Sequence, residues 1–266
     1  MGAAIRSEFR KIFTTRLWWG MAIGIFVAGA LFAGFFGWVL TSEQAGSPGG
    51  GPALEGNTTQ VVNSVYTAGL GVGYLLLLTM GILQIGAEYR HKTITATFLA
   101  TPQRVRAMLA KVVALLGIGG LYGLISLLGS VVVGAVVLTL RDIDPFPSTE
   151  VLRTLALSLL ALGLWALIGL GVGILIPNQV AAILVGVGVA WIVEPLLGLG
   201  LSYVDAAKDV VPYFPSNATN AMVNGVTQGG SQVDYLPWWA GALVLAGYAA
   251  ALTAFGTWRT VRQDIS

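Results

Sequence analysis

Long runs of hydrophobic residues alternate with short polar segments along the whole chain. A helix needs about 20 consecutive apolar residues to cross the hydrocarbon core of a bilayer, so each long run predicts a membrane span. A spanning β-strand would instead show about ten residues of alternating polarity, and the runs lack that alternation. We therefore expect an all-α, polytopic membrane protein that forms a single transmembrane domain over residues 1–266. The six expected spans are residues 17–40, 65–87, 112–140, 154–176, 180–203 and 237–257.

The composition supports a membrane protein. Hydrophobic residues make up 56% of the chain and charged residues only 10%, with a mean hydropathy of +0.80. Soluble domains carry roughly 25% charged residues, so the composition argues against a water-soluble fold. The net charge of +2 does not indicate a nucleic-acid partner, because the basic residues flank apolar runs and form no stripe. One histidine and no cysteine argue against a structural zinc site, and we expect no metal or cofactor in this chain.

The first 16 residues show helical periodicity with charge on one side. The basic residues are Arg6, Arg10, Lys11 and Arg16, and the apolar residues opposite them are Ile5, Phe9, Ile12 and Phe13. This pattern predicts an amphipathic helix that lies on the inner membrane surface. The alternative is a basic flank that only orients the first span.

The distribution of basic residues predicts which loops face the cytosol. With the expected spans, eleven of the fourteen lysines and arginines fall on the side that holds both termini and residues 88–111. Cytosolic loops of membrane proteins carry such an excess. We therefore expect a multi-pass protein of the cell (inner or plasma) membrane with both termini in the cytosol. Residues 41–64, 141–153 and the polar segment 204–236 would then face outward.

Residues 88–111 form a strongly basic internal segment between two long apolar runs. They include the basic residues Arg90, Lys92, Arg104, Arg106 and Lys111 and the apolar residues Ile94, Phe98 and Leu99. Thr101 and Pro102 are typical of a helix start, with Thr as the N-cap and Pro at the first helical position. This combination predicts a cytosolic hairpin on which a soluble partner could dock.

A phosphate-binding loop of the form G-x-x-x-x-G-K-[ST] does not occur in the chain, because none of its four lysines follows a glycine. If ATP drives this protein, we expect the hydrolysis, with its ATP and Mg²⁺, on a separate ATPase subunit. The chain itself would then not be an enzyme.

The order of elements resembles the ABC-2 type permease family, with a surface helix, six spans and a cytosolic hairpin between spans two and three. In the hairpin the resemblance is carried by Glu88, Thr93, Phe98-Leu99, Pro102, Arg104 and Lys111. One departure is His91-Lys92, where a glycine often precedes the threonine.

The resemblance implies the transmembrane subunit of an ATP-binding-cassette exporter. Two permeases would assemble as a homodimer, or as a heterodimer with a related permease, and carry two ATPase subunits. The coupling residues implied are Glu88, Arg90, Thr93, Phe98, Leu99, Pro102 and Arg104. Alternating access would export a compound that the apolar spans suggest is hydrophobic or amphipathic.

Glu194 is the one carboxylate inside an expected span, followed directly by Pro195. Charged residues at membrane depth usually face a bundle interior or a cavity, so we interpret Glu194 as a substrate-pathway or proton-relay residue. The alternative is a residue near the outer interface, where the helix breaks and the following residues re-enter.

Two other classes of function stay open. A proton-coupled secondary transporter would use Glu194 as its carrier, although such folds usually contain inverted repeats and we find no match between the halves. A membrane scaffold or an intramembrane enzyme is the other, but the spans lack the clustered His, Ser or Asp residues of an enzyme.

Two further patterns are glycine pairs at four-residue spacing and a pair of aspartates. Glycines four residues apart occur at Gly20/Gly24, Gly69/Gly73 and Gly169/Gly173, and we favour packing within one subunit over a dimer interface as their role. Asp142 and Asp144 form a D-x-D pair, which we interpret as a solvated loop rather than a metal site.

Overall fold

The structure is a computed structural model that describes residues 1–42, 58–93, 104–204, 208–223 and 235–262. The described residues form helices and no strand. The helices are α1 (Gly2–Phe13), α2 (Leu17–Leu40), α3 (Thr58–Thr67), α4 (Leu70–Arg90), α6 (Arg104–Thr139), α7 (Thr149–Leu175), α8 (Gln179–Gly188), the π-helix η1 (Val189–Val193), α9 (Glu194–Ser202), the 3₁₀ helix η2 (Lys208–Tyr213), α10 (Pro215–Val223) and α11 (Trp238–Arg262).

The expected all-α class is confirmed for the described residues. Six helical stretches of the described chain are long and apolar enough to cross a membrane: Leu17–Leu40, Thr58–Arg90, Val105–Thr139, Thr149–Leu175, Gln179–Leu201 and Trp238–Trp258. Most limits lie within a few residues of the expected ones. The largest differences are at two starts: the second stretch begins at Thr58 rather than at residue 65 because α3 precedes α4, and the third begins at Val105 rather than at residue 112. The 36 residues of α6 reach about 54 Å at 1.5 Å per residue, so this helix projects beyond a hydrocarbon core of about 30 Å.

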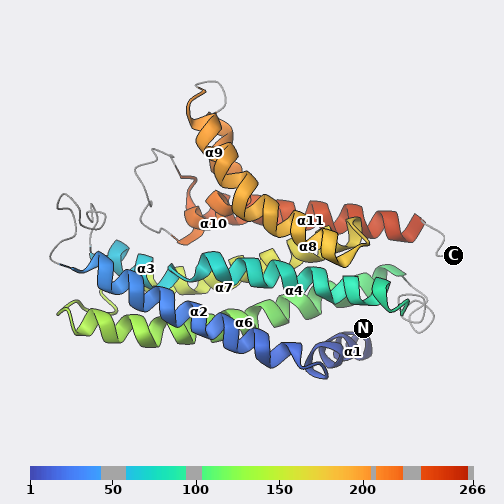
Figure 1. Ribbon diagram of the computed structural model, residues 1–266, viewed down its shortest axis with the longest axis horizontal. Helices are drawn as coiled ribbons and strands as arrows, with labels where there is room; N and C mark the ends of the chain where they lie inside the picture. The colour runs from blue at the N-terminus through green and yellow to red at the C-terminus, as the bar shows by residue number, and fades with distance from the viewer. Residues whose placement is uncertain (43–57, 94–103, 205–207, 224–234, 263–266) are drawn as a thin grey trace.

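Helix α7 lies at the centre of the bundle (Figure 1). It packs against α4, α6 and α11, and 72% of its most apolar window is buried. The stretch formed by α8, η1 and α9 is peripheral, with 22% of its window buried, and α9 turns away from the other helices (Figure 1). Its apolar side chains therefore face outward, as lipid-facing side chains do in a membrane bundle.

Glycines permit the closest helix contacts. A side chain at Gly81 would overlap the backbone of Ala166, and one at Gly169 would overlap the backbone of Leu78, so α4 and α7 meet backbone to backbone. Small residues allow this approach in membrane helices. The pairs Gly69/Gly73 and Gly169/Gly173 contact atoms of this same chain, as we expected. The pair Gly20/Gly24 meets no atom within 4 Å.

The segment we expected to be a polar outer loop, residues 204–236, contains a buried helix. Ala218, Thr219 and Met222 of α10 are fully enclosed, and α10 packs between α7 and α11. Trp165 of α7 donates a hydrogen bond from its indole nitrogen to the Thr219 hydroxyl at 2.9 Å. Pro215 begins α10 and Asn217 and Asn220 lie within it, so the composition of this helix resembles that of a loop.

Helix α1, the end of α4, the beginning of α6 and the end of α11 lie at the same end of the bundle (Figure 1). The turn between α6 and α7 lies at the opposite end. This arrangement agrees with the expected alternation of the spans. The cytosolic position of the first end stays a prediction.

Candidate functional site

Four ionisable side chains meet where α1, α4 and α6 converge, and we call them the ionic cluster: Glu8, Lys11, Glu88 and Lys111. The Lys111 ammonium lies 2.8 Å from Glu8 Oε2 and 2.5 Å from Glu88 Oε1. The Lys11 ammonium lies 2.6 Å from Glu8 Oε1 and 2.6 Å from Glu88 Oε1. Each lysine therefore bridges both carboxylates, and the cluster as a whole is neutral.

The local sequence places each member of the cluster. Glu8 and Lys11 are three residues apart on α1 and so share one face of that helix. Gln84, one turn before Glu88 on α4, donates a hydrogen bond to Glu8 Oε2 at 3.0 Å. On the same side of α1, the Phe9 ring packs against Gly117 of α6, where a side chain would leave no room for it.

The cluster is buried apart from Lys11. The side chain of Lys111 is 1% exposed and those of Glu8 and Glu88 are each 5% exposed, whereas Lys11 is 37% exposed. Burial opposes the ionisation of Glu8, but Lys111 and Lys11 outweigh it and hold the pKa of Glu8 below its ordinary value. Burial likewise opposes the charge on Lys11, but hydrogen bonds to Glu8 and Glu88 raise the pKa of Lys11 above its ordinary value.

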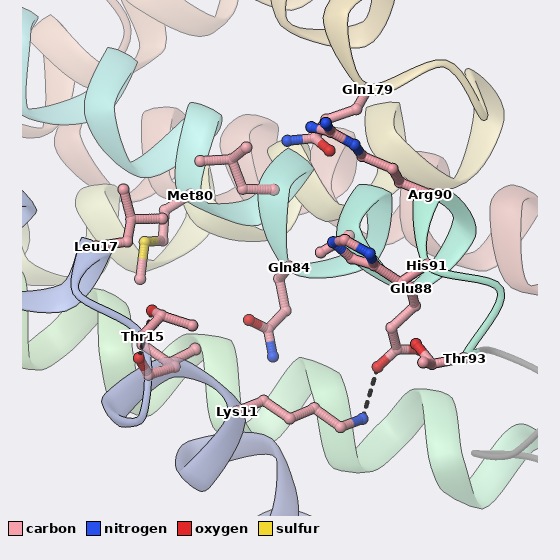
Figure 2. Close-up of a pocket in the computed structure, with 13 residues that line it drawn as sticks. Lys11, Thr15, Leu17, Met80, Gln84, Glu88, Arg90, His91, Thr93 and Gln179 are labelled. Atoms are coloured by element: carbon pink, nitrogen blue, oxygen red, sulfur yellow. Dashed lines mark hydrogen bonds and ion pairs between the residues drawn. The ribbon is translucent and has the colours of Figure 1, made fainter.

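A cleft of about 490 Å³ opens beside the ionic cluster. It is lined by Lys11, Ile12, Thr15, Leu17, Met80, Leu83, Gln84, Ala87, Glu88, Arg90, His91, Thr93 and Gln179. Figure 2 shows Leu17 and Met80 on one side of the cleft and Glu88, His91 and Thr93 on the other. The wall thus changes from apolar to polar along α4.

Glu88 has an unused hydrogen-bonding atom. Both lysines contact Oε1, and within the described part of the chain the buried Oε2 has no hydrogen-bond partner. Leaving a buried polar atom unpaired costs about 1–3 kcal/mol.

Helix α4 ends in a turn that would normally use glycine. The backbone N–H of Lys92 bonds to the Tyr89 carbonyl and that of Thr93 to the Glu88 carbonyl, at 3.2 and 3.0 Å. This is the pattern of a Schellman motif, in which the residue after the helix adopts the left-handed conformation. Lys92 holds that conformation with a φ of 53°, at the position where the family resemblance had led us to expect glycine.

The predicted coupling residues separate into three groups. Glu88, Arg90 and Thr93 all line the cleft, Glu88 buried and the other two exposed. Arg104 begins α6, but its side chain lies outside the described part of the chain. Phe98, Leu99 and Pro102 also lie outside the described residues.

Glu194 lies far along the chain from this cleft and has a structural contact. It begins α9 directly after the π-helix η1, is 8% exposed, and its Oε2 accepts a hydrogen bond from the Ser216 backbone nitrogen at 2.9 Å. Ser216 is in the first turn of α10, whose N–H groups favour a negative partner. The alternative interpretation supposed that the helix ends at Glu194. In the structure the chain continues as α9 from Glu194 to Ser202.

The D-x-D pair behaves as a loop. Asp144 accepts a hydrogen bond from the Phe146 backbone nitrogen at 2.9 Å, which makes a local turn. Among the described residues, no group of three or more histidine, aspartate or glutamate side chains is placed to hold a metal ion.

Sequence reasoning missed Glu8, Gln84 and Gln179 as site residues and assigned Lys11 to the polar face of a surface helix. The signal available was the single acid among the basic residues of α1, three positions before Lys11. Lys111 was named as a basic residue of the 88–111 segment and as part of the family resemblance, but without a partner.

Comparison with known proteins found neither a protein-family model nor a curated protein that matches this chain.

Proposed function

We propose that this chain is the permease subunit of an ATP-driven exporter that resembles the ABC-2 type. In this proposal two copies, or one copy and a related permease, form the pathway and bind two separate ATPase subunits. The cargo is a hydrophobic or amphipathic compound, and transport follows alternating access.

The ionic cluster is the observation that carries the proposal. Glu88 and Lys111 stand at the two ends of the 88–111 segment, one at the end of α4 and the other in the first turns of α6. Their contact, together with Glu8 and Lys11, ties both ends of this segment to each other and to α1. A partner that displaced the segment would therefore move α4 and α6 together rather than bending a free loop.

The proposed partner is an ATPase that docks on the 88–111 segment from the cytosol. The segment carries four positive charges at Arg90, Lys92, Arg104 and Arg106, around the apolar residues Ile94, Phe98 and Leu99. Binding hot spots are apolar and buried, with charge steering at the rim. ATP binding would favour one conformation of the two ATPase subunits. Because that conformation binds one state of the permease more tightly than the other, the permease would shift toward that state.

In this proposal α1 lies along the inner surface of the membrane. Arg6 and Arg10 are exposed while Ile12 is buried, which suits a helix lying along the inner membrane surface against α6. Trp18 and Trp19 follow at the beginning of α2, where indole rings prefer the membrane interface. The excess of basic residues at this end of the bundle supports its cytosolic location and that of both termini.

The test is co-purification of the permease with the ATPase subunit that a neighbouring reading frame would encode. Phe98→Ala should weaken the complex by roughly 2–4 kcal/mol, because it empties an apolar contact but leaves every orienting charge in place. Arg104→Ala, the matched control, should mainly slow association in low salt. Full assembly and full ATP hydrolysis in the Phe98 variant would show that the 88–111 segment is not the docking element.

Glu194 is our second proposal for a functional residue, as part of the substrate pathway. It is buried next to a π-helical turn, a feature frequent at functional sites. Glu194→Gln keeps the volume and a side-chain oxygen for Ser216. If this variant transports at the parental rate at every pH, Glu194 only caps α10 and the proton-coupled alternative also fails.

A further inference from the structure

Helix α1 carries exposed arginines on the side that faces away from the other helices. Successive residues of an α-helix are about 100° apart, so Arg6 and Arg10, two residues before and two after Glu8, each lie about 160° around α1 from it. Glu8 is buried in contact with Lys111 of α6, whereas both arginines are exposed. Arg16, in the turn between α1 and α2, is exposed as well. We call these three arginines the arginine face, and the ionic cluster fixes the rotation of α1 that exposes it.

Among the described residues, no exposed acid at this end of the bundle balances the arginine face. The two acids of the described chain at this end are Glu8 and Glu88, and both are buried in contact with lysines. The three arginines form no ion pair with any described residue. The surface of α1 is therefore positive although the ionic cluster is neutral.

Aromatic rings run from α1 to α2 beside the arginine face, and we call them the aromatic row: Phe9, Phe13 and Trp18. The rings of Phe9 and Phe13 are stacked with centroids 6.3 Å apart, and Phe13 meets Trp18 edge to face at 5.7 Å. Phe13 and Trp18 are exposed. Because residues three apart are neighbours on a helix surface, Phe13 lies next to Arg10. One exposed side of α1 thus joins apolar rings to positive charge.

Contacts with α6 give the depth of each part, because α6 begins at this end of the bundle and runs toward the other (Figure 1). Lys111 of the ionic cluster comes first along α6. Gly117, against which Phe9 packs, lies six residues or about 9 Å further along. Tyr122, about 8 Å beyond Gly117, donates a hydrogen bond from its hydroxyl to the Trp18 carbonyl at 2.9 Å. The aromatic row therefore lies deeper than the ionic cluster.

This order of depth fits a helix at the membrane interface. Such helices bury their apolar side about 5–10 Å into the boundary between headgroups and acyl chains. With the aromatic row toward the acyl chains, the arginine face beside it lies at the level of the lipid phosphates. Arginine binds phosphate through paired N–H groups, and no described acid lies beside these arginines to hold an ammonium group. A headgroup with a net negative charge is the better fit.

We propose that the arginine face of α1 binds the phosphates of anionic phospholipids, with the aromatic row inserted among their acyl chains. The inference rests on the position of α1 at the membrane surface in the proposed function, but not on the ATPase or the cargo. Its test therefore uses the purified protein without the ATPase, so that its failure and the failure of the proposed function can be told apart.

The test compares phosphatidylglycerol with phosphatidylcholine carrying the same acyl chains. Native mass spectrometry of the protein in detergent measures the binding of each lipid. We expect the parent to bind phosphatidylglycerol more tightly. Arg6→Gln combined with Arg10→Gln should weaken phosphatidylglycerol binding about fivefold for each arginine and change phosphatidylcholine binding much less.

Three further variants separate charge, position and apolar contact. Lys92→Gln combined with Arg106→Gln removes the same charge from exposed residues outside α1 and should leave the lipid preference nearly unchanged. Arg6→Lys combined with Arg10→Lys keeps the charge and should keep most of the preference. Phe13→Ala should weaken the binding of both lipids by a similar factor, because it removes apolar contact but no charge.

Several results would overturn the proposal. An equal loss in the two glutamine pairs would reduce the preference to general attraction by basic residues. A loss in the lysine pair as large as in the Arg6 and Arg10 glutamine pair would show that charge does not carry the preference. Competition by inorganic phosphate at the concentrations at which the lipid binds would make the ligand a soluble anion. If the Arg6 and Arg10 glutamine pair keeps the preference but no longer co-purifies with the ATPase, the arginine face is a protein contact.

Discussion

At the scale of single residues, the ionic cluster balances two buried carboxylates with two ammonium groups. Replacing a buried ion pair by apolar residues is often harmless, whereas removing one partner leaves an uncompensated charge. Lys111 is the most buried member, and it contacts both Glu8 and Glu88. Its removal therefore has the largest expected effect.

Lys111→Met should lower the free energy of unfolding by about 3–5 kcal/mol, because Glu8 and Glu88 would then share Lys11 alone. Thermal unfolding of the detergent-purified protein measures the loss. Arg106→Met, which removes an exposed charge five residues earlier on α6, is the control and should change stability by less than about 1 kcal/mol. Combining Lys111→Met with Glu8→Gln should recover part of the loss by restoring neutrality, and a purely additive result would contradict the cluster.

Glu8 and Lys11 set limits to the pH range of stability. The pKa of Glu8 is lowered, so its contribution is present above the ordinary value of 4.5 and is lost as the pH falls through the lower folded-state value. The pKa of Lys11 is raised, so its contribution is complete below the ordinary value of 10.5 and is lost as the pH rises through the higher folded-state value. The unfolding temperature should therefore drop on the acid side of this window and on its alkaline side.

Glu8→Gln isolates the acid limb of this profile. The difference in unfolding temperature between the parent and this variant should be constant near neutral pH and shrink below about pH 4.5, where Glu8 of the unfolded parent takes up a proton before Glu8 of the folded parent does. A difference that stays constant as the pH falls well below that value would show that Glu8 is not held ionised by the two lysines.

The cluster illustrates what the sequence could and could not predict for residues. The helical periodicity of α1 was readable, but periodicity alone could not show that Lys11 turns toward Glu88, because that contact joins residues 77 positions apart. The same holds for Lys111, whose contacts with Glu8 and Glu88 form only where α1, α4 and α6 converge.

At the scale of the elements, the spans were predictable because each contains a long apolar run, and the limits of α2 agree at both ends. Helix α3 was missed because it begins with Thr58, Thr59 and Gln60, which resemble the preceding loop. Helix α10 was missed for a similar reason, since its burial depends on contacts with α7 and α11 rather than on its own composition. The left-handed turn at Lys92 could be located only through the family resemblance, which marked a glycine position there.

The contact between α4 and α7 gives a prediction at this scale. Gly169→Leu should destabilise the bundle by about 1–3 kcal/mol or more, because the new side chain would overlap the Leu78 backbone. Gly120→Leu is the matched control, since no atom lies within 4 Å of a side chain there. Thermal unfolding in detergent compares the two, and equal stability would contradict the close packing of α4 on α7.

At the scale of the whole molecule, the topology is open to direct labelling because the chain has no native cysteine. With both termini in the cytosol, cysteines introduced at Gly50 and Gly229 should react with a membrane-impermeant thiol reagent added to intact cells. A cysteine at Gln263 should react only after the membrane is permeabilised. Labelling of the Gln263 variant in sealed cells would contradict the orientation.

The central claim is that a separate ATPase moves the 88–111 end of this bundle so that the pathway opens at the opposite end. Arg106 at the start of α6 and Glu150 at the start of α7 are exposed residues at these two ends. Spin labels at one of these positions in each copy of the assembled homodimer report the distance between copies by pulsed electron resonance. Trapping the complex with ATP and vanadate should shorten the distance between the Arg106 labels and lengthen that between the Glu150 labels. Unchanged distances at both ends, in a complex that hydrolyses ATP, would contradict the account.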